Sequence, residues 1–136
     1  MAYAGDVTSL IAWEALKSDS QTVLIDVRTK AEWNFVGLPD IKSTKKNLLC
    51  IEWQFFPNGG INPDFQKEFK NHISKNNISY FLCRSGARSR SAAIAMSNEG
   101  YKCFNIEDGF EGNLNQSNQR SSKNGWKFSG LPWFQT

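Results

Sequence analysis

The chain has 136 residues, 40% of them hydrophobic and 21% charged, and a formal net charge of +3. This length suits one domain with a single core, and the composition is typical of a soluble globular protein. No apolar run approaches the roughly 20 residues that span a bilayer. The first residues lack the basic and apolar regions of a secretory signal. We therefore expect no membrane partner and a cytoplasmic location.

The positive charge is not gathered into long Lys/Arg runs, which disfavours nucleic acid as a partner and favours small anions. The densest basic patch apart from residues 83–90 is 42–46, and we expect it to be a solvated loop. The three cysteines are odd in number and show no CxxC spacing, so neither a disulfide framework nor a metal site is expected. His72 is the only histidine. It lies in a polar segment, and we expect it on the surface rather than as a metal ligand.

The first half of the chain alternates predicted helices and strands. A helix capped by Thr8 or Ser9 is expected to run to about residue 17. The continuous apolar run 22–27 suits a strand that is buried on both faces of a parallel sheet. Residues 29–35 are predicted to form a short helix with Thr29 and Glu32 at capping-box spacing. A further strand is expected at 47–53.

The second half continues this alternation. We expect a helix over 62–75 with Pro63 at its first position, a strand over 78–82, a helix over 91–99 and a strand over 101–106. Strands that alternate with helices predict an α/β domain of three layers, with a mainly parallel central sheet and helices on both faces. In such sheets, sites form beyond the carboxyl ends of the strands.

The pattern weakens after residue 106. Residues 113–124 are polar and almost free of apolar anchors, so we expect a loop or a short exposed helix there. Large aromatic residues return in 125–128 and 131–134. Because such residues are seldom left in solvent, we expect the C-terminal tail to pack back onto the domain.

Cys83 leads a short basic turn that ends at Arg90, between a predicted strand and a predicted helix. A cysteine at a strand end is more often a buried small hydrophobe than a nucleophile. Cys50 and Cys103 fit that interpretation, because each lies in an apolar run without adjacent cations. Cys83 departs from it, because the eight residues 83–90 also contain a glycine, two serines and three arginines.

This turn can aim backbone N–H groups and the positive end of the helix dipole at the sulfur, which favours the nucleophilic thiolate. A glycine lets the backbone come close, hydroxyls can donate hydrogen bonds inward, and planar guanidinium groups suit oxyanions. The residues that offer these groups are Gly86, Ser85, Ser89, Arg84 and Arg88. The implied substrate is a small anion.

The run Cys-Arg-Ser-Gly-Ala-Arg-Ser at 83–89 resembles the active-site loop of single-domain rhodaneses, a family of sulfurtransferases. Leu-Ile-Asp-Val-Arg at 24–28 with Glu-Trp at 32–33 resembles the first signature of that family. Gly-Trp-Lys at 125–127 with Gly-Leu-Pro at 130–132 resembles its closing segment. The resemblance covers 5–133 as one rhodanese domain. Residues 113–124 then look like an inserted polar loop, which either flanks the pocket or is inert surface.

The resemblance implies a double displacement without a metal or organic cofactor. The Cys83 thiolate would attack the outer sulfur of a donor such as thiosulfate, sulfite would leave, and cyanide, a small thiol or a protein thiol would take the sulfur from the persulfide. Arg84 and Arg88 would bind the oxyanion end of the donor, while Asp26 and Arg28 would brace the loop. The implied active-site loop is Arg84, Ser85, Gly86, Ala87, Arg88 and Ser89.

Two other functions stay open at this point. Phosphatases and arsenate reductases of the same fold have a wider loop, whereas here only four residues separate Cys83 from Arg88. The tighter loop has room for one extra sulfur, which favours sulfur transfer over phosphoryl transfer. A binding or sensing module that keeps the fold without turnover is the remaining alternative.

Overall fold

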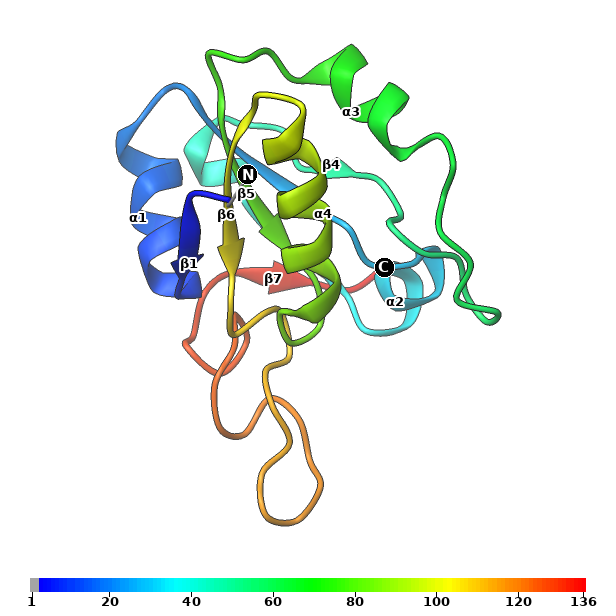
Figure 1. Cartoon of the computed structure of the whole chain (residues 1–136). Helices are drawn as coiled ribbons and strands as arrows, with labels where there is room; N and C mark the ends of the chain where they lie inside the picture. The colour runs from blue at the N-terminus through cyan, green and yellow to red at the C-terminus, as the bar shows by residue number, and fades with distance from the viewer. Residues whose placement is uncertain (1–2) are drawn as a thin grey trace.

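The computed structural model describes residues 3–136 and has a five-stranded, fully parallel sheet at its centre (Figure 1). The strand order is β1-β6-β5-β2-β4. Helices cover both faces, so the predicted α/β architecture is confirmed. The strands are β1 (Gly5–Val7), β2 (Thr22–Asp26), β4 (Leu49–Cys50), β5 (Ile78–Leu82) and β6 (Lys102–Ile106).

Each face of the sheet has its own hydrophobic cluster. On one face, side chains of α3 (Phe65–His72) and α4 (Ala87–Asn98) pack against β2 and β5. On the other face, α1 (Ser9–Ser18) packs together with the C-terminal tail. Alternate residues of β5 serve the two clusters: Phe81 belongs to the first, and Tyr80 and Leu82 belong to the second.

Helix starts follow the local capping chemistry. The Thr8 hydroxyl accepts the Ile11 N–H at the start of α1, and α2 (Lys30–Phe35) begins with the predicted capping box of Thr29 and Glu32. The prediction for α3 was too long: the Asn62 side chain accepts the N–H of Asp64, which turns the chain before the helix begins.

Helix α4 begins four residues earlier than predicted. Gly86 is its N-cap residue with φ of 108°, and the N–H of Arg90 already donates to the Gly86 carbonyl. Residues 87–90 are therefore the first helical turn rather than part of a loop. This places Ala87, Arg88 and Ser89 on a rigid element directly beyond β5.

The tail packs onto the domain, as predicted. Trp126 is fully buried, and its indole N–H donates to the Pro132 carbonyl at 2.7 Å. Farther on, β7 (Trp133–Phe134) pairs antiparallel with β3 (Leu38–Pro39), a small sheet that the sequence pattern did not reveal. The 113–124 stretch protrudes as a long loop, drawn in orange at the bottom of Figure 1.

The 42–46 patch lies on the surface as expected, with Lys42, Ser43 and Lys45 exposed, although the Lys46 ammonium donates to backbone carbonyls of Leu16 and Asp19 at the end of α1. The expectation that Cys50 is buried was wrong. Cys50 is exposed on the edge strand β4, whereas Cys103 is buried as expected. His72 lies on the surface.

Within residues 3–136, no helix is long and apolar enough to cross a membrane. The same residues contain no group of three or more His, Cys, Asp or Glu side chains arranged to hold a metal ion.

Candidate active site

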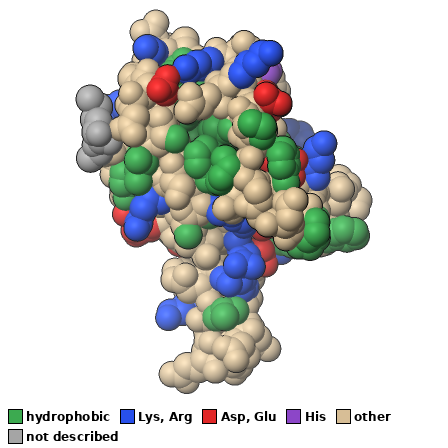
Figure 2. All heavy atoms as spheres, turned by 45° about the vertical axis from the view of Figure 1, so that its right-hand side comes forward, with side chains coloured by type: hydrophobic (Ala, Val, Ile, Leu, Met, Phe, Trp, Pro, Cys, Tyr) green, Lys and Arg blue, Asp and Glu red, His purple; other side chains and the backbone are tan. Residues whose placement is uncertain are grey.

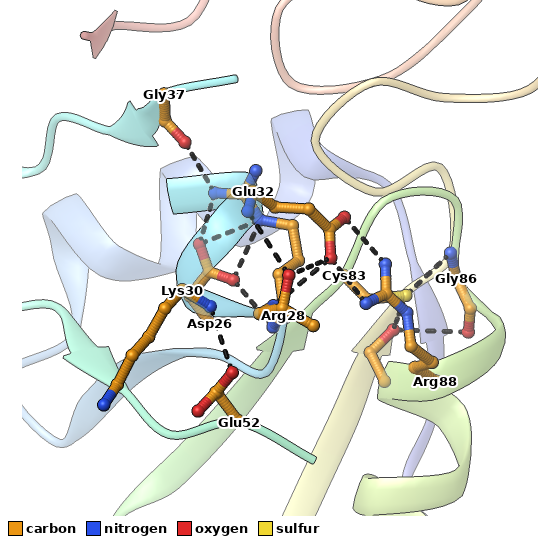
Figure 3. A network of polar contacts seen from close by, with 11 residues as sticks. Asp26, Arg28, Lys30, Glu32, Gly37, Glu52, Cys83, Gly86 and Arg88 are labelled. Atoms are coloured by element: carbon orange, nitrogen blue, oxygen red, sulfur yellow. Dashed lines mark hydrogen bonds and ion pairs between the residues drawn. The ribbon is translucent and has the colours of Figure 1, made fainter. Parts of the chain in front are cut away.

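Cys83 lies at the carboxyl end of β5 and is only 1% exposed. Its sulfur accepts two hydrogen bonds, one from the Gly86 N–H and one from the Ser89 hydroxyl, each at 3.1 Å (Figure 3). Both donors lie at the start of α4, a helix of 12 residues, whose dipole adds positive potential at this end. The geometry is therefore that of a cradle for an anionic sulfur.

Gly86 is required on two grounds. Its φ of 108° is a conformation that residues with a Cβ rarely adopt, and a Cβ there would lie 2.4 Å from the Glu107 carbonyl oxygen. Residues after β6 also hold the Cys83 loop in place. The Phe110 N–H donates to the Cys83 carbonyl at 2.8 Å, and the Gly112 N–H donates to the Arg84 carbonyl at 3.0 Å. The first residues of the loop are therefore fixed by backbone hydrogen bonds.

Asn105 is a site residue that the sequence analysis missed. It is fully buried on β6, and its carbonyl oxygen lies 2.5 Å from the Ser89 hydroxyl. Its NH₂ group donates to the Gly86 carbonyl at 3.2 Å and to the Asp6 carboxylate at 3.0 Å. Because both amide protons are used, the side-chain oxygen is left to face Ser89. The signal in the sequence was a polar amide inside an otherwise apolar strand.

The Ser89 hydroxyl has one proton and three acceptors within 3.2 Å: the Cys83 sulfur, the Gly86 carbonyl and the Asn105 oxygen. It can serve only one of them at a time. When the sulfur is a thiol, its proton can be donated to Ser89 while Ser89 donates to Asn105. When the sulfur is an anion, the hydroxyl can turn its proton to the sulfur. The arrangement can therefore accommodate both charge states of Cys83.

Arg88 is not the free anion clamp that the sequence suggested. Its guanidinium makes a two-pronged ion pair with Glu32 on α2, at 2.7 and 2.9 Å (Figure 3). Burial raises the pKa of Glu32, but the hydrogen bonds and charge of Arg88, with help from Thr29, outweigh it and lower this pKa to about 2. The hydrogen bond to Glu32 also raises the pKa of Arg88, against burial, with a smaller contribution from Cys83.

The other loop residues occupy different environments. Arg84 is exposed, and its guanidinium makes no hydrogen bond or ion pair with any residue from 3 to 136. Ala87 is exposed. Ser85 is half-buried, and within the same described range its hydroxyl has no hydrogen-bond partner. Among the loop hydroxyls predicted to point inward, only that of Ser89 reaches the sulfur.

Asp26 and Arg28 are fully buried and bind each other. The Asp26 carboxylate accepts from the Arg28 side chain at 2.7 to 3.2 Å, and a second Arg28 bond goes to the Gly37 carbonyl. Burial lowers the pKa of Arg28, but the charge and hydrogen bonds of Asp26 outweigh it and raise this pKa. Arg28 also stacks on the Phe110 ring at 4.3 Å. The backbone N–H of Phe110 also donates to the Cys83 carbonyl, so Phe110 connects the buried pair of Asp26 and Arg28 to the Cys83 loop.

An open cleft of about 560 Å³ lies beside the loop. Its lining includes Arg84 and Arg88, which follow Cys83 in the chain, and aromatic residues of α2 and of the 52–62 segment. Arg120 also lines it, so the 113–124 stretch contributes to the cleft. The lining residues are Thr29, Ala31, Glu32, Phe35, Val36, Gln54, Phe55, Phe56, Pro57, Gly59, Arg84, Arg88, Glu111 and Arg120.

Comparison with known proteins places this geometry in a family context. The family model described as the STR4 middle domain matches residues 4–136. An uncharacterized protein of Rickettsia rickettsii is 42% identical over 131 residues, which cover 94% of this chain and 95% of that protein. The rhodanese-like domain-containing protein 4 of Arabidopsis thaliana, a chloroplastic protein, is 29% identical over 127 residues, 91% of this chain and 24% of the plant protein.

Solved structures agree with these matches. The crystal structure of Rv0390 from M. tuberculosis has a TM-score of 0.90 and 42% identity, covering 99% of this chain and 100% of that one. The polysulfide-sulfur transferase of Wolinella succinogenes has a TM-score of 0.67 at 20% identity, with coverage of 96% and 78%. At that identity the likeness shows the fold alone, and the fold is rhodanese-like.

Proposed function

Because this chain belongs to the STR4 middle-domain family and has a rhodanese-like fold, we propose that it is a sulfurtransferase that carries sulfane sulfur on Cys83. The observation that supports this most directly is the cradle at the start of α4, where the Gly86 N–H and the Ser89 hydroxyl both lie 3.1 Å from the sulfur. Two donors aimed at one sulfur stabilise negative charge on it.

The reaction would proceed in two displacements. The Cys83 thiolate attacks the outer sulfur of a small anionic donor such as thiosulfate, a new S–S bond forms, and sulfite leaves with the electron pair of the broken bond. A thiol acceptor, small or carried on a protein, or cyanide in an assay, then takes the outer sulfur and returns the thiolate. In both halves the negative charge stays on sulfur, where the cradle can stabilise it.

Arg84 is the loop cation best placed to bind the donor. The Arg88 guanidinium is occupied by Glu32, whereas that of Arg84 has no partner within residues 3–136 and lines the cleft. A free planar guanidinium can donate hydrogen bonds to two oxyanion oxygens at once. The proposed division of roles is therefore Cys83 as nucleophile, Arg84 as donor-binding group, and Arg88 with Glu32 as a support for the loop.

Intact-protein mass spectrometry after incubation with thiosulfate tests this function. We expect the mass to increase by one sulfur atom and to return to the starting value when cyanide is added. Cys83→Ser should abolish the increase. Cys50→Ser is the matched control, because Cys50 is an exposed cysteine outside the cradle, and it should leave the increase intact.

An unchanged wild-type mass with every donor would contradict the proposal. A normally folded protein whose Cys83 neither forms a persulfide nor reacts with iodoacetamide at neutral pH would favour the binding or sensing module. Cys83-dependent release of phosphate from an aryl phosphate would favour the phosphatase.

A further inference from the structure

Three phenylalanines beside the active-site loop are exposed to an unusual degree. Phe35 is 81% exposed and Phe56 is 69% exposed, and with Phe55 they line the cleft; we call these three residues the aromatic wall. They come from the end of α2 and from the 52–62 segment. Exposed aromatic rings gathered at one cleft mark a place where an apolar ligand gains free energy by covering them.

The lining of the same cleft has a basic balance of charge. It holds three arginines against two glutamates, a net charge of +1. Arg88 and Glu32 neutralise each other, and Arg120 donates to the Gly112 carbonyl. Arg84 is left with its whole guanidinium available, and it follows Cys83 directly in the chain. Figure 2 shows basic side chains where the protruding loop meets the domain, with hydrophobic side chains beside them.

The cleft is far larger than an inorganic donor requires. Thiosulfate has five heavy atoms and no apolar part, whereas this cleft has a volume of about 560 Å³, within the range of sites for organic molecules. A donor that fills it needs an anionic head at Arg84, a sulfur that reaches the loop, and an apolar body that extends over the aromatic wall.

We propose that the cleft selects organic sulfane-sulfur anions in which an apolar body is joined directly to the sulfur-bearing head, in preference to thiosulfate. This inference rests on the proposed function. For a thiosulfonate, R–SO₂–S⁻, the Cys83 thiolate bonds to the outer sulfur, the S–S bond of the donor breaks, and the sulfinate R–SO₂⁻ leaves with the electron pair. No oxidant or reductant is required, and the apolar body leaves with the sulfinate.

A graded donor series tests the selection. Thiosulfate, methanethiosulfonate and benzenethiosulfonate share the reacting S–S end and differ in the attached body. Persulfide formation is measured as kcat/KM with cyanide as acceptor, and each donor is corrected for its rate with free cysteine. We expect the corrected ratio of benzenethiosulfonate to methanethiosulfonate to be about 10 in the wild type, the effect of placing one ring against an apolar surface.

Phe35→Ala and Phe56→Ala should each reduce this ratio about threefold, and the double variant should reduce it nearly to one. The matched control is Phe128→Ala, a similarly exposed ring (54%) outside the cleft lining, which should leave the ratio unchanged. A wild-type ratio near one, or a ratio that survives the double substitution, would overturn the inference.

A binding experiment separates this inference from the function on which it rests. Cys83→Ser protein, which cannot transfer sulfur, is titrated with benzenesulfinate and followed by NMR. Saturable shifts at the aromatic wall that weaken in Phe56→Ala support the cleft even if no donor yields a persulfide, in which case the proposed function alone fails. If thiosulfate yields the persulfide but benzenesulfinate does not bind, the proposed sulfurtransferase function is supported and the proposed preference for organic donors is wrong.

Discussion

The ends of β2 and β5 lie side by side, yet they are built for opposite purposes. The two strands pair in parallel with Asp26 opposite Leu82, and the Val27 N–H donates to the Leu82 carbonyl at 2.9 Å. At the end of β2, Asp26 and Arg28 bind each other, and both are fully buried. After β5, the chain turns so that an amide and a hydroxyl point at the Cys83 sulfur.

The difference lies in whether a buried charge has an opposite charge bound to it. The Asp26 carboxylate receives the main-chain and side-chain donors of Arg28, so its charge is balanced inside the protein. The Cys83 sulfur accepts from two neutral donors, and no cationic group of the described residues 3–136 is bound to it. At the first strand end a buried cation and a buried anion neutralise each other, whereas at its neighbour hydrogen-bond donors surround a sulfur whose negative charge would form and disappear in the proposed reaction.

The largest expected effect on stability comes from breaking the buried ion pair of Asp26 and Arg28. Asp26→Asn leaves the buried Arg28 cation without its counterion, and we expect the free energy of unfolding to fall by about 3–5 kcal/mol. Urea denaturation measures this loss. Glu14→Gln, which breaks the exposed pair with Lys17, is the control and should not move the midpoint measurably. A loss no greater than in the control would show that the pair does not hold this strand end.

The next largest effect is expected from a change in the backbone of the Cys83 loop. Gly86→Ala combines a positive φ with a collision at the Glu107 carbonyl, and we expect a loss of about 2–3 kcal/mol of stability together with slower iodoacetamide labelling of Cys83. Gly130 also has a positive φ but has open space around it. Gly130→Ala therefore isolates the conformational strain and should leave labelling at the wild-type rate. Equal labelling in the two variants would contradict the role of Gly86 in the cradle.

Breaking the ion pair between Glu32 on α2 and Arg88 on α4 should have an intermediate effect on stability. Glu32→Gln removes the partner of Arg88, and we expect a loss of about 2 kcal/mol at pH 7 after allowance for screening. The pKa of Glu32 is lowered from 4.5 to about 2, because the hydrogen bonds and charge of Arg88 outweigh the effect of burial. The stabilisation is therefore fully present above about pH 4.5 and disappears as the pH falls toward 2.

Denaturation of both proteins across this range checks that prediction. The difference in unfolding free energy between wild type and Glu32→Gln should shrink as the pH is lowered. Glu99→Gln, which breaks an exposed pair of similar length with Lys70, is the comparison and should show a much smaller change. A difference that stays constant with pH would mean that the Glu32 carboxylate is not the group responsible.

The smallest effect concerns one hydroxyl. Ser89→Ala removes one of the two donors to the sulfur, and we expect the alkylation rate of Cys83 at pH 7 to fall about fivefold, the equivalent of about 1 kcal/mol. Ser91→Ala, on the exposed side of the same helix, is the control. If alkylation is as fast in Ser89→Ala as in Ser91→Ala, the hydroxyl serves Asn105 rather than the sulfur.

Local chemistry made much of the fold predictable. The apolar run at β2, the capping box at Thr29 and the strand at β5 appear where the sequence placed them, because each depends on neighbouring residues. The start of α4 was misjudged, since a run rich in Arg and Ser is typical of a loop, whereas here the positive φ of Gly86 allows the helix to begin at once. The pairing of β3 with β7 joins residues almost 100 positions apart and has no local signal.

The candidate site was predictable only in part, for the same reason. The Cys83 loop is contiguous in the chain, so its residues were found together. The partners of Arg88 and Ser89 come from other elements, and only the tertiary structure brings Glu32 and Asn105 to them. The aromatic wall was equally hidden, because phenylalanines such as Phe35, Phe55 and Phe56 are usually core residues, and they are recognised as part of a surface only once their exposure is known.

The short edge strand β1 is connected to the Cys83 loop through Asn105. Asp6 on this strand accepts one of the two amide protons that fix the orientation of Asn105, and Asn105 in turn holds the Gly86 carbonyl and faces Ser89. Detachment of residues 5–7 from β6 would therefore let the Asn105 amide rotate, and its oxygen would no longer be held as the acceptor for the Ser89 hydroxyl beside Cys83. Strand β1, far from the Cys83 loop in sequence, is therefore joined through Asn105 to the hydroxyl that lies beside the sulfur.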